Sequence, residues 1–192
     1  VGGKPTAVVV ASDNAGRAEW IQKNLSGHTF RLYTSSDVTG VELGGAMKNI
    51  MAIAAGVSDG LGLGESTRAA LITRALSELV RLGEHLGGRH ETFFGLSGLG
   101  DLVLTCGSHQ SRNHQVGERL ARGETLEDIV PSMNGVAEGI RNTQSFHQVA
   151  AKNGIDAPII GATYGILYQG VTPAKAIESL MGRGLKKENE RI

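Results

Sequence analysis

The chain has 192 residues, enough for one domain, or one and a half, with a hydrophobic core. Its 19 Lys and Arg residues balance its 19 Asp and Glu residues, so no global field attracts nucleic acid or an anionic membrane. One cysteine, Cys106, excludes an internal disulfide framework, and no apolar run approaches the roughly 18 residues that insert in a membrane. These features favour a cytoplasmic protein without a nucleic acid partner, and any anion site must be local.

The first elements are a strand, a helix and a second strand. Residues 6–11 form a short, continuously apolar run, typical of a strand buried on both faces of a parallel sheet. A helix over 15–25, N-capped by Asp13, and a strand over 30–34 complete one βαβ unit. One such unit cannot cover two faces of a strand, and the chain opens without an initiator methionine. We therefore expect residues 1–37 to be the trailing part of a nucleotide-binding domain.

From residue 38 the pattern becomes helical and predicts an all-α domain over 38–192. Residues 41–55 are small and apolar on nearly every face, so this helix must be buried. The glycine-rich segment Gly60–Gly64 follows a helix rather than a strand, so we interpret it as a turn and not as a dinucleotide fingerprint. Further helical patterns cover 71–86, 92–105 with a hinge at Ser97-Gly98, 113–121, 126–130, 137–151, 159–168 and 173–181.

Lys48 lies in the middle of the most apolar helix, where a lysine is rarely buried without a partner or a task. It either reaches out to the surface or serves as an acid–base group for a carbonyl or alcohol oxygen. The side chain of Asn49 points about 100° round the helix from that of Lys48, so Asn49 either contacts the same ligand or braces the site. Asp101, in a glycine-dense segment, fits an N-cap of the following helix. Placed across a pocket from Lys48, it would instead orient the ammonium group.

Ser111, Arg112 and Asn113 precede a helical pattern. A helix N-terminus directs free N–H groups and the positive end of the dipole at an anion, and a guanidinium adds a bidentate fork for phosphate. The trio therefore indicates a phosphate site, with a solvated arginine beside a capping serine as the alternative.

No metal site is expected from the histidine pattern. His85 and His90 have glutamates beside them, but a Gly-Gly break separates the two histidines, so they do not share a helical face. Cys106 has no histidine partner at a recognisable spacing, and we interpret it as a small buried apolar side chain.

Five segments in this order and spacing resemble the bacterial NAD(P)-dependent glycerol-3-phosphate dehydrogenase family. They are residues 40–49, 54–64, 68–74, 91–102 and 136–139. The resemblance implies a helical domain like the C-terminal domain of 6-phosphogluconate dehydrogenase, preceded by a βαβ remnant of a Rossmann domain. It also implies reduction of dihydroxyacetone phosphate to sn-glycerol 3-phosphate with NAD or NADP, a step that supplies phospholipid synthesis.

The same resemblance implies roles for individual residues. Lys48 would be the proton donor and acceptor at the substrate C2, with Asp101 beside it. The substrate would be held by Lys48, Asn49, Asp101, Ser111, Arg112 and Asn113, and the cofactor by Arg112, Val136 and Glu138. The assembly state stays open, with a homodimer as one arrangement to test.

Two other functions are weighed against this one. A related β-hydroxyacid dehydrogenase typically has an asparagine four residues after the catalytic lysine, whereas this chain has Ala52 there. A helical interaction module without catalysis is the other alternative. Because most of a dinucleotide fold is missing from this sequence, the chain on its own is expected to be inactive.

Overall fold

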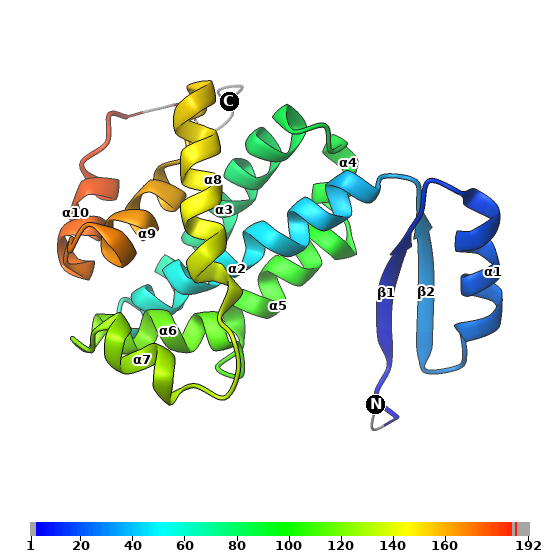
Figure 1. The fold of residues 1–192 in the computed structure, drawn as a ribbon, viewed down its shortest axis with the longest axis horizontal. Coiled ribbons are helices and arrows are strands. Elements are labelled where there is room, and N and C mark those ends of the chain that lie inside the picture. The colour runs from blue at the N-terminus through cyan, green and yellow to red at the C-terminus, as the bar shows by residue number, and fades with distance from the viewer. Residues whose placement is uncertain (1–2, 186, 188–192) are drawn as a thin grey trace.

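A computed structural model describes residues 3–185 and residue 187. Figure 1 shows a small sheet unit joined to a larger helical body. The sheet unit consists of β1 (Thr6–Ala11), α1 (Ala15–Leu25) and β2 (Phe30–Ser35), and the two strands are parallel with Thr6 opposite Phe30. The predicted βαβ unit is therefore confirmed. The cap of α1 is Asn14 rather than Asp13, because Asn14 directly precedes the helix and its side chain accepts from the backbone N–H of Arg17.

The helical body confirms the predicted fold class. Its elements are α2 (Val38–Gly60), α3 (Glu65–His85), α4 (His90–Phe93), the π-helical turn η1 (Leu96–Gly100), α5 (Asp101–Gly107), α6 (Arg112–Ala121), α7 (Leu126–Ser132), α8 (Glu138–Asn153), α9 (Pro158–Tyr168) and α10 (Pro173–Met181). The predicted hinge at Ser97-Gly98 is wrong, because both residues lie inside η1 and the break falls at Phe94-Gly95. Across the described residues, no helix combines the length and apolar character that a membrane crossing requires.

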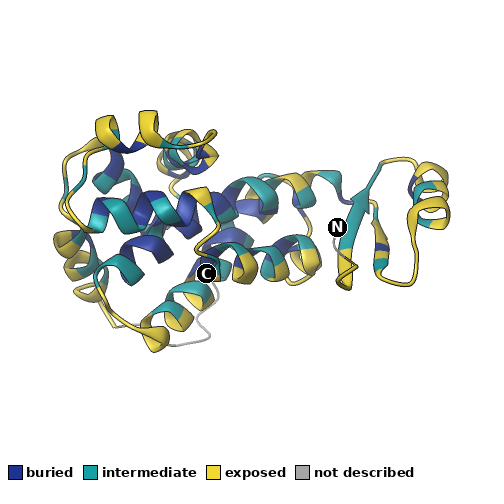
Figure 2. Cartoon of the chain, turned by 90° about the horizontal axis from the view of Figure 1, so that it is seen from below, coloured by how far each residue is buried: buried dark blue, intermediate teal, exposed yellow. Residues whose placement is uncertain are grey.

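Helix α2 runs through the centre of the helical body. Its residues from Met47 to Ser58 are almost all buried, as predicted for an apolar helix of this kind, and α3, α5, α6, α8 and α9 all contact it. Figure 2 shows this buried centre surrounded by helices whose outer faces are exposed. A polar side chain on α2 is therefore surrounded by other elements of the fold, which restricts where it can point.

Asp37 fixes the start of α2. Its carboxylate accepts hydrogen bonds from Gly40 N at 2.9 Å, Arg89 N at 2.8 Å and Thr92 Oγ1 at 2.6 Å. Burial alone would raise the pKa of Asp37, but these bonds and the Arg89 charge outweigh burial and lower the pKa. The junction between the sheet unit and α2 is thereby tied to the segment that precedes and forms α4.

Helices α2 and α6 touch along their backbones. A β-carbon on Gly117 of α6 would overlap the carbonyl oxygen of Ile53, and one on Gly56 of α2 would overlap the carbonyl oxygen of His114. Gly60, one turn after Gly56, would place a β-carbon 2.8 Å from the carbonyl oxygen of Glu118. Glycine is needed at these positions because any side chain would separate the two helices.

The close contact predicts the effect of Gly117→Ala. Alanine favours a helix by about 1 kcal/mol over glycine, but the overlap with rigid backbone costs about 1–3 kcal/mol or more, so the free energy of unfolding should fall. Gly45→Ala is the matched control, because Gly45 is also helical and its β-carbon would meet nothing within 4 Å. Urea unfolding should show Gly45→Ala as neutral or stabilising. Equal stability of Gly117→Ala and the parent would contradict the backbone contact.

Glu78 of α3 is a buried carboxylate at the start of α9. It is 3% exposed and accepts hydrogen bonds from Ile159 N at 2.6 Å and Ile160 N at 3.2 Å. Burial raises the pKa of Glu78 to about 7, although both hydrogen bonds and Arg81 act in the opposite direction. The free backbone N–H groups at the start of α9 are thus bound by the Glu78 carboxylate, and burial destabilises the negative charge of that carboxylate.

This raised pKa makes stability depend on pH. The pKa of Glu78 is higher in the folded state than its unfolded value of 4.5. Glu78 therefore adds to the free energy of unfolding, and this contribution is fully present below about pH 4.5 and is lost as the pH rises through about 7. The loss is on the order of 3 kcal/mol. The free energy of unfolding of the parent relative to Glu78→Gln should therefore fall over this range, whereas exposed Glu127→Gln should show no such trend. A relative stability that rises with pH would refute the assignment.

Candidate active site around Lys48

Lys48 of α2 and Asp101 of α5 form an ion pair. The Lys48 Nζ donates to Asp101 Oδ2, and the two side chains are 22% and 30% exposed. Asp101 Oδ1 also accepts from Thr105 Oγ1 at 3.2 Å, one turn further along α5. The predicted N-cap role of Asp101 is wrong, because Gly100 holds the N-cap position and Asp101 is the first residue of α5, with its carboxylate paired to Lys48. The ammonium is held in place while part of it stays accessible to a ligand.

A chain of buried amides links α2, α6 and α8. Asn113 Nδ2 donates to Asn49 Oδ1 at 2.9 Å, and Asn113 Oδ1 accepts from Gly139 N at 2.9 Å. Both asparagines are 8% exposed, and Asn49 Nδ2 also donates to Gly45 O at 3.2 Å. The two side chains thus brace the site. A ligand contact by Asn113 would fall to its backbone N–H, in the first turn of α6.

Ser111 and Arg112 form the N-terminus of α6. Ser111 caps the helix, since its side chain accepts from His114 N at 3.4 Å. Arg112 is exposed, and its guanidinium lies against the backbone of Gly135, which has a φ of 106°. The loop that begins there carries Val136, 64% exposed, and leads to Glu138, the exposed first residue of α8. Arg112 and the two residues expected at the cofactor therefore belong to neighbouring segments.

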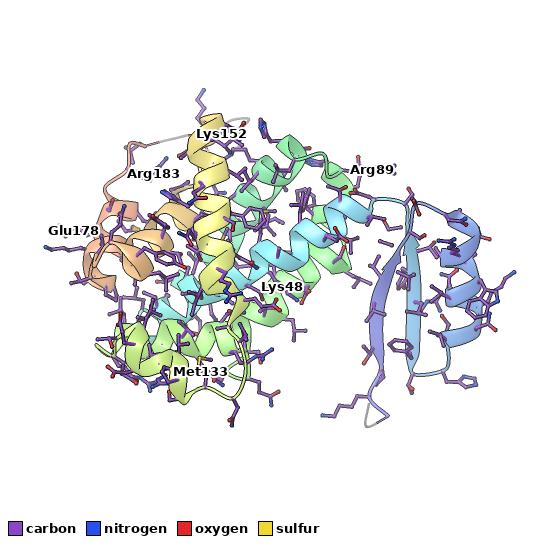
Figure 3. All side chains as sticks on the ribbon, viewed as in Figure 1. Lys48, Arg89, Met133, Lys152, Glu178 and Arg183 are labelled. Carbon is purple, nitrogen blue, oxygen red and sulfur yellow. The ribbon has the colours of Figure 1, made fainter. Side chains whose placement is uncertain are left out.

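One bracing residue of the site carried no sequence signal. Asn142 of α8 donates from Nδ2 to the carbonyl oxygen of Ala46 at 3.0 Å and so holds α8 against α2 within one turn of Lys48. Figure 3 shows Lys48 on α2 near the start of α8. Asn142 lies 96 residues from its partner, so no local pattern predicts the contact.

Cys106 lies on α5, one turn after Leu102. It is a free thiol and 1% exposed, which confirms the predicted buried apolar role. Burial raises the pKa of Cys106 to about 12, so the thiol stays protonated and offers no nucleophile.

Two hollows of the described surface lie away from Lys48. One lies against α3 and α10, and the other lies where α6, α7, α9 and α10 meet. Lys48 lines neither of them, and we call the surface at the partly exposed Lys48–Asp101 ion pair the open face of the helical body. An anchored ammonium, a helix N-terminus and an exposed guanidinium define a site class that suits a small anionic ligand with an oxygen to be protonated.

The comparisons with known proteins agree with this description. The family model for the NAD-dependent glycerol-3-phosphate dehydrogenase C-terminus matches residues 37–178. A protein from Desulfovibrio desulfuricans named glycerol-3-phosphate dehydrogenase (NAD(P)+) is 53% identical over 184 residues, which are 96% of this chain and 55% of the relative. One of the same name from Solidesulfovibrio magneticus is 54% identical over 96% of this chain and 56% of its own length.

A solved structure gives the same result for the fold. The crystal structure of glycerol-3-phosphate dehydrogenase from Coxiella burnetii superposes with a TM-score of 0.90 at 44% sequence identity, covering 94% of this chain and 56% of that one. The chain belongs to the NAD-dependent glycerol-3-phosphate dehydrogenase family, and it spans about 55% of the length of the relatives it matches. The family resemblance noted in the sequence is thereby confirmed.

Proposed function

We propose that this chain supplies the substrate site of a glycerol-3-phosphate dehydrogenase that interconverts dihydroxyacetone phosphate and sn-glycerol 3-phosphate with NAD or NADP. The observation that carries the proposal is the Lys48–Asp101 ion pair, joined through the Asn49–Asn113 hydrogen bond to the N-terminus of α6. These hydrogen bonds thus fix the distance between a proton donor and an anion site. A short phosphorylated ketone requires such a fixed distance, because its carbonyl oxygen and its phosphate bind at the same time.

Lys48 is the acid–base group in this proposal. In the reductive direction its ammonium donates a proton to the C2 oxygen as that oxygen gains negative charge, and in the oxidative direction the amine removes the proton from the alcohol. Asp101 stays a carboxylate that positions Nζ and balances its charge. Because Thr105 holds the second oxygen of Asp101, the carboxylate cannot swing freely.

The phosphate of the substrate binds at the start of α6. Arg112 supplies a guanidinium, and the first turn of the helix supplies backbone N–H groups with the positive end of the dipole. Ser111 shapes this end as the cap, whereas the side chains of Asn113 and Asn49 hold α6 at a fixed distance from Lys48.

The residues around Gly135 fit a dinucleotide cofactor. Val136 offers an exposed apolar surface beside the cation of Arg112, and a nicotinamide dinucleotide combines a planar ring with anionic phosphates. Arg112, Val136 and Glu138 are the residues that would contact it. When bound, the cofactor supplies or accepts the hydride at C2.

The domain assignment is part of the proposal. Residues 1–37 form part of the dinucleotide-binding domain, and residues 38–192 form the substrate-binding domain. The matched part of this chain covers about 55% of the relative from Desulfovibrio desulfuricans, and the remaining length of that relative supports a second wall for the open face at Lys48. We further propose a cytoplasmic enzyme of phospholipid synthesis that acts as a homodimer. The buried, unpaired thiol of Cys106 is compatible with a reducing compartment.

Lys48→Met tests the catalytic assignment. The substitution keeps the volume of the side chain and removes the proton donor, so kcat should drop at least about 100-fold with little change in the NAD(P)H dissociation constant. The assay is reduction of dihydroxyacetone phosphate by the polypeptide as its gene encodes it. Lys152→Met, on an exposed position of α8, should retain parental activity. If kcat of Lys48→Met stays within a few-fold of the parent, Lys48 is not the acid–base group; an inactive parent would favour the non-catalytic module.

Arg112→Ala tests the phosphate site. A charge-assisted hydrogen bond to an anion contributes about 1.5–3 kcal/mol, so kcat/KM for dihydroxyacetone phosphate should fall about 10- to 150-fold. Arg122→Ala is the matched control, because Arg122 is an exposed arginine at the opposite end of α6. Equal kcat/KM for Arg112→Ala and the control would assign Arg112 to the solvated surface.

A further inference from the structure

Two histidines and a glutamate meet at α6, outside the site described above. His109 belongs to the loop before α6, and His114 and Glu118 lie one turn apart on the helix. One ligand atom from each of the three side chains lies within 4.8 Å of the other two. His114 follows Arg112 by two residues, so its side chain points about 200° round the helix from that of Arg112.

His114 is the unusual member of this group. Its side chain is fully buried, and Nε2 lies 2.9 Å from Asp59 Oδ2 on α2. Among the described residues, its Nδ1 has no hydrogen-bond partner, because the nearer Glu118 oxygen is 3.9 Å away. If Nε2 carries the hydrogen that Asp59 accepts, Nδ1 directs a lone pair toward a carboxylate. A cation between the two groups would satisfy both of them.

Asp59 orients His114 as metal-binding histidines are usually oriented. A histidine that ligates a metal almost always donates its other ring N–H to a carboxylate or carbonyl, which fixes the tautomer and turns the free nitrogen toward the ion. Asp59 is itself held by Arg68 Nη1 at 2.8 Å, so this support is rigid.

His109 completes the group from the solvent side. Its Nδ1 lies 3.2 Å from Glu118 Oε1, and its ring meets that of His114 edge-on with centroids 5.1 Å apart. Gln115 Nε2 donates to the His109 carbonyl oxygen at 2.8 Å and holds the loop in place. Because the His109 side chain is 71% exposed, an ion has a path of entry. A surface ion pair between His109 and Glu118 would leave the buried Nδ1 of His114 unexplained.

We propose that His109, His114 and Glu118 bind a divalent transition-metal ion of the Zn²⁺ class. Two imidazoles and one carboxylate form a known three-ligand set for Zn²⁺, with a fourth position open to water. Small movements of the exposed His109 side chain and the half-buried Glu118 side chain would bring the ligand atoms to bonding distance. The ion would fasten the loop that leads to Ser111 and Arg112 onto α6. The metal-site proposal does not rest on the proposed dehydrogenase activity.

The test is calorimetric titration of tag-free, chelator-treated protein with Zn²⁺ near neutral pH. The parent should bind one ion per chain in a saturable manner. His109→Ala and Glu118→Gln should each weaken the affinity at least about 10-fold, because each removes a ligand. These two variants are chosen because replacing the fully buried His114 could unfold the protein. Co²⁺ in place of Zn²⁺ should give the visible absorption of a low-coordinate site in the parent but not in His109→Ala.

His90→Ala is the matched control. His90 is also exposed and its Nδ1 lies 2.8 Å from Glu84 Oε1, so it reproduces the histidine–carboxylate pair without a second histidine. This variant should bind Zn²⁺ as the parent does. The proposal is overturned if the parent shows no saturable binding, or if His109→Ala and Glu118→Gln bind as tightly as the parent. An equal loss in His90→Ala would also overturn it, since the ion would then be bound only adventitiously at the surface.

Discussion

The backbone contact between α2 and α6 is the constraint on which the candidate site depends. Gly56 and Gly117 place no side chain at the points where the two backbones touch, so the separation of the two helices is set by backbone atoms. Because of that separation, Asn49 and Asn113 can reach each other with short side chains at 2.9 Å. A wider crossing would break the amide bridge and move the N-terminus of α6 away from Lys48.

This arrangement separates the acid–base function from anion recognition while keeping them rigidly spaced. Lys48 is fixed by α5 through Asp101, whereas Arg112 extends from the end of α6 toward the loop at Gly135. Neither side chain is buried completely, so both can meet a ligand at the open face. The buried hydrogen bonds of Asn113, by contrast, are made to other groups of the protein, and they fix the distance between Lys48 and the N-terminus of α6.

The sequence predicted most of this fold because its signals are local. An apolar run, a glycine turn and a helical period each lie within one element, and Lys48 is conspicuous because its neighbours in the chain are apolar. The contacts that it did not predict join distant segments. Glu78 meets α9 across 81 residues, and Asn142 meets Ala46 across 96 residues, so neither partner can be inferred from spacing. The π-helical turn η1 was missed for a different reason, since Gly98 packs against the nearby backbone of Phe93 instead of ending a helix.

The two faces of α6 are coupled by the same geometry. Asn113 faces the amide bridge to Asn49, and the next residue, His114, faces Asp59 near the other end of α2. Both contacts hold α6 against one rigid helix, and they lie 10 residues apart along α2. A change in the His114 environment therefore acts on a helix that cannot rotate without straining the Asn49–Asn113 bond. An ion held by His109, His114 and Glu118 would restrict the loop before Ser111, so metal binding on one face of α6 would reduce the motion of Arg112 at its N-terminus.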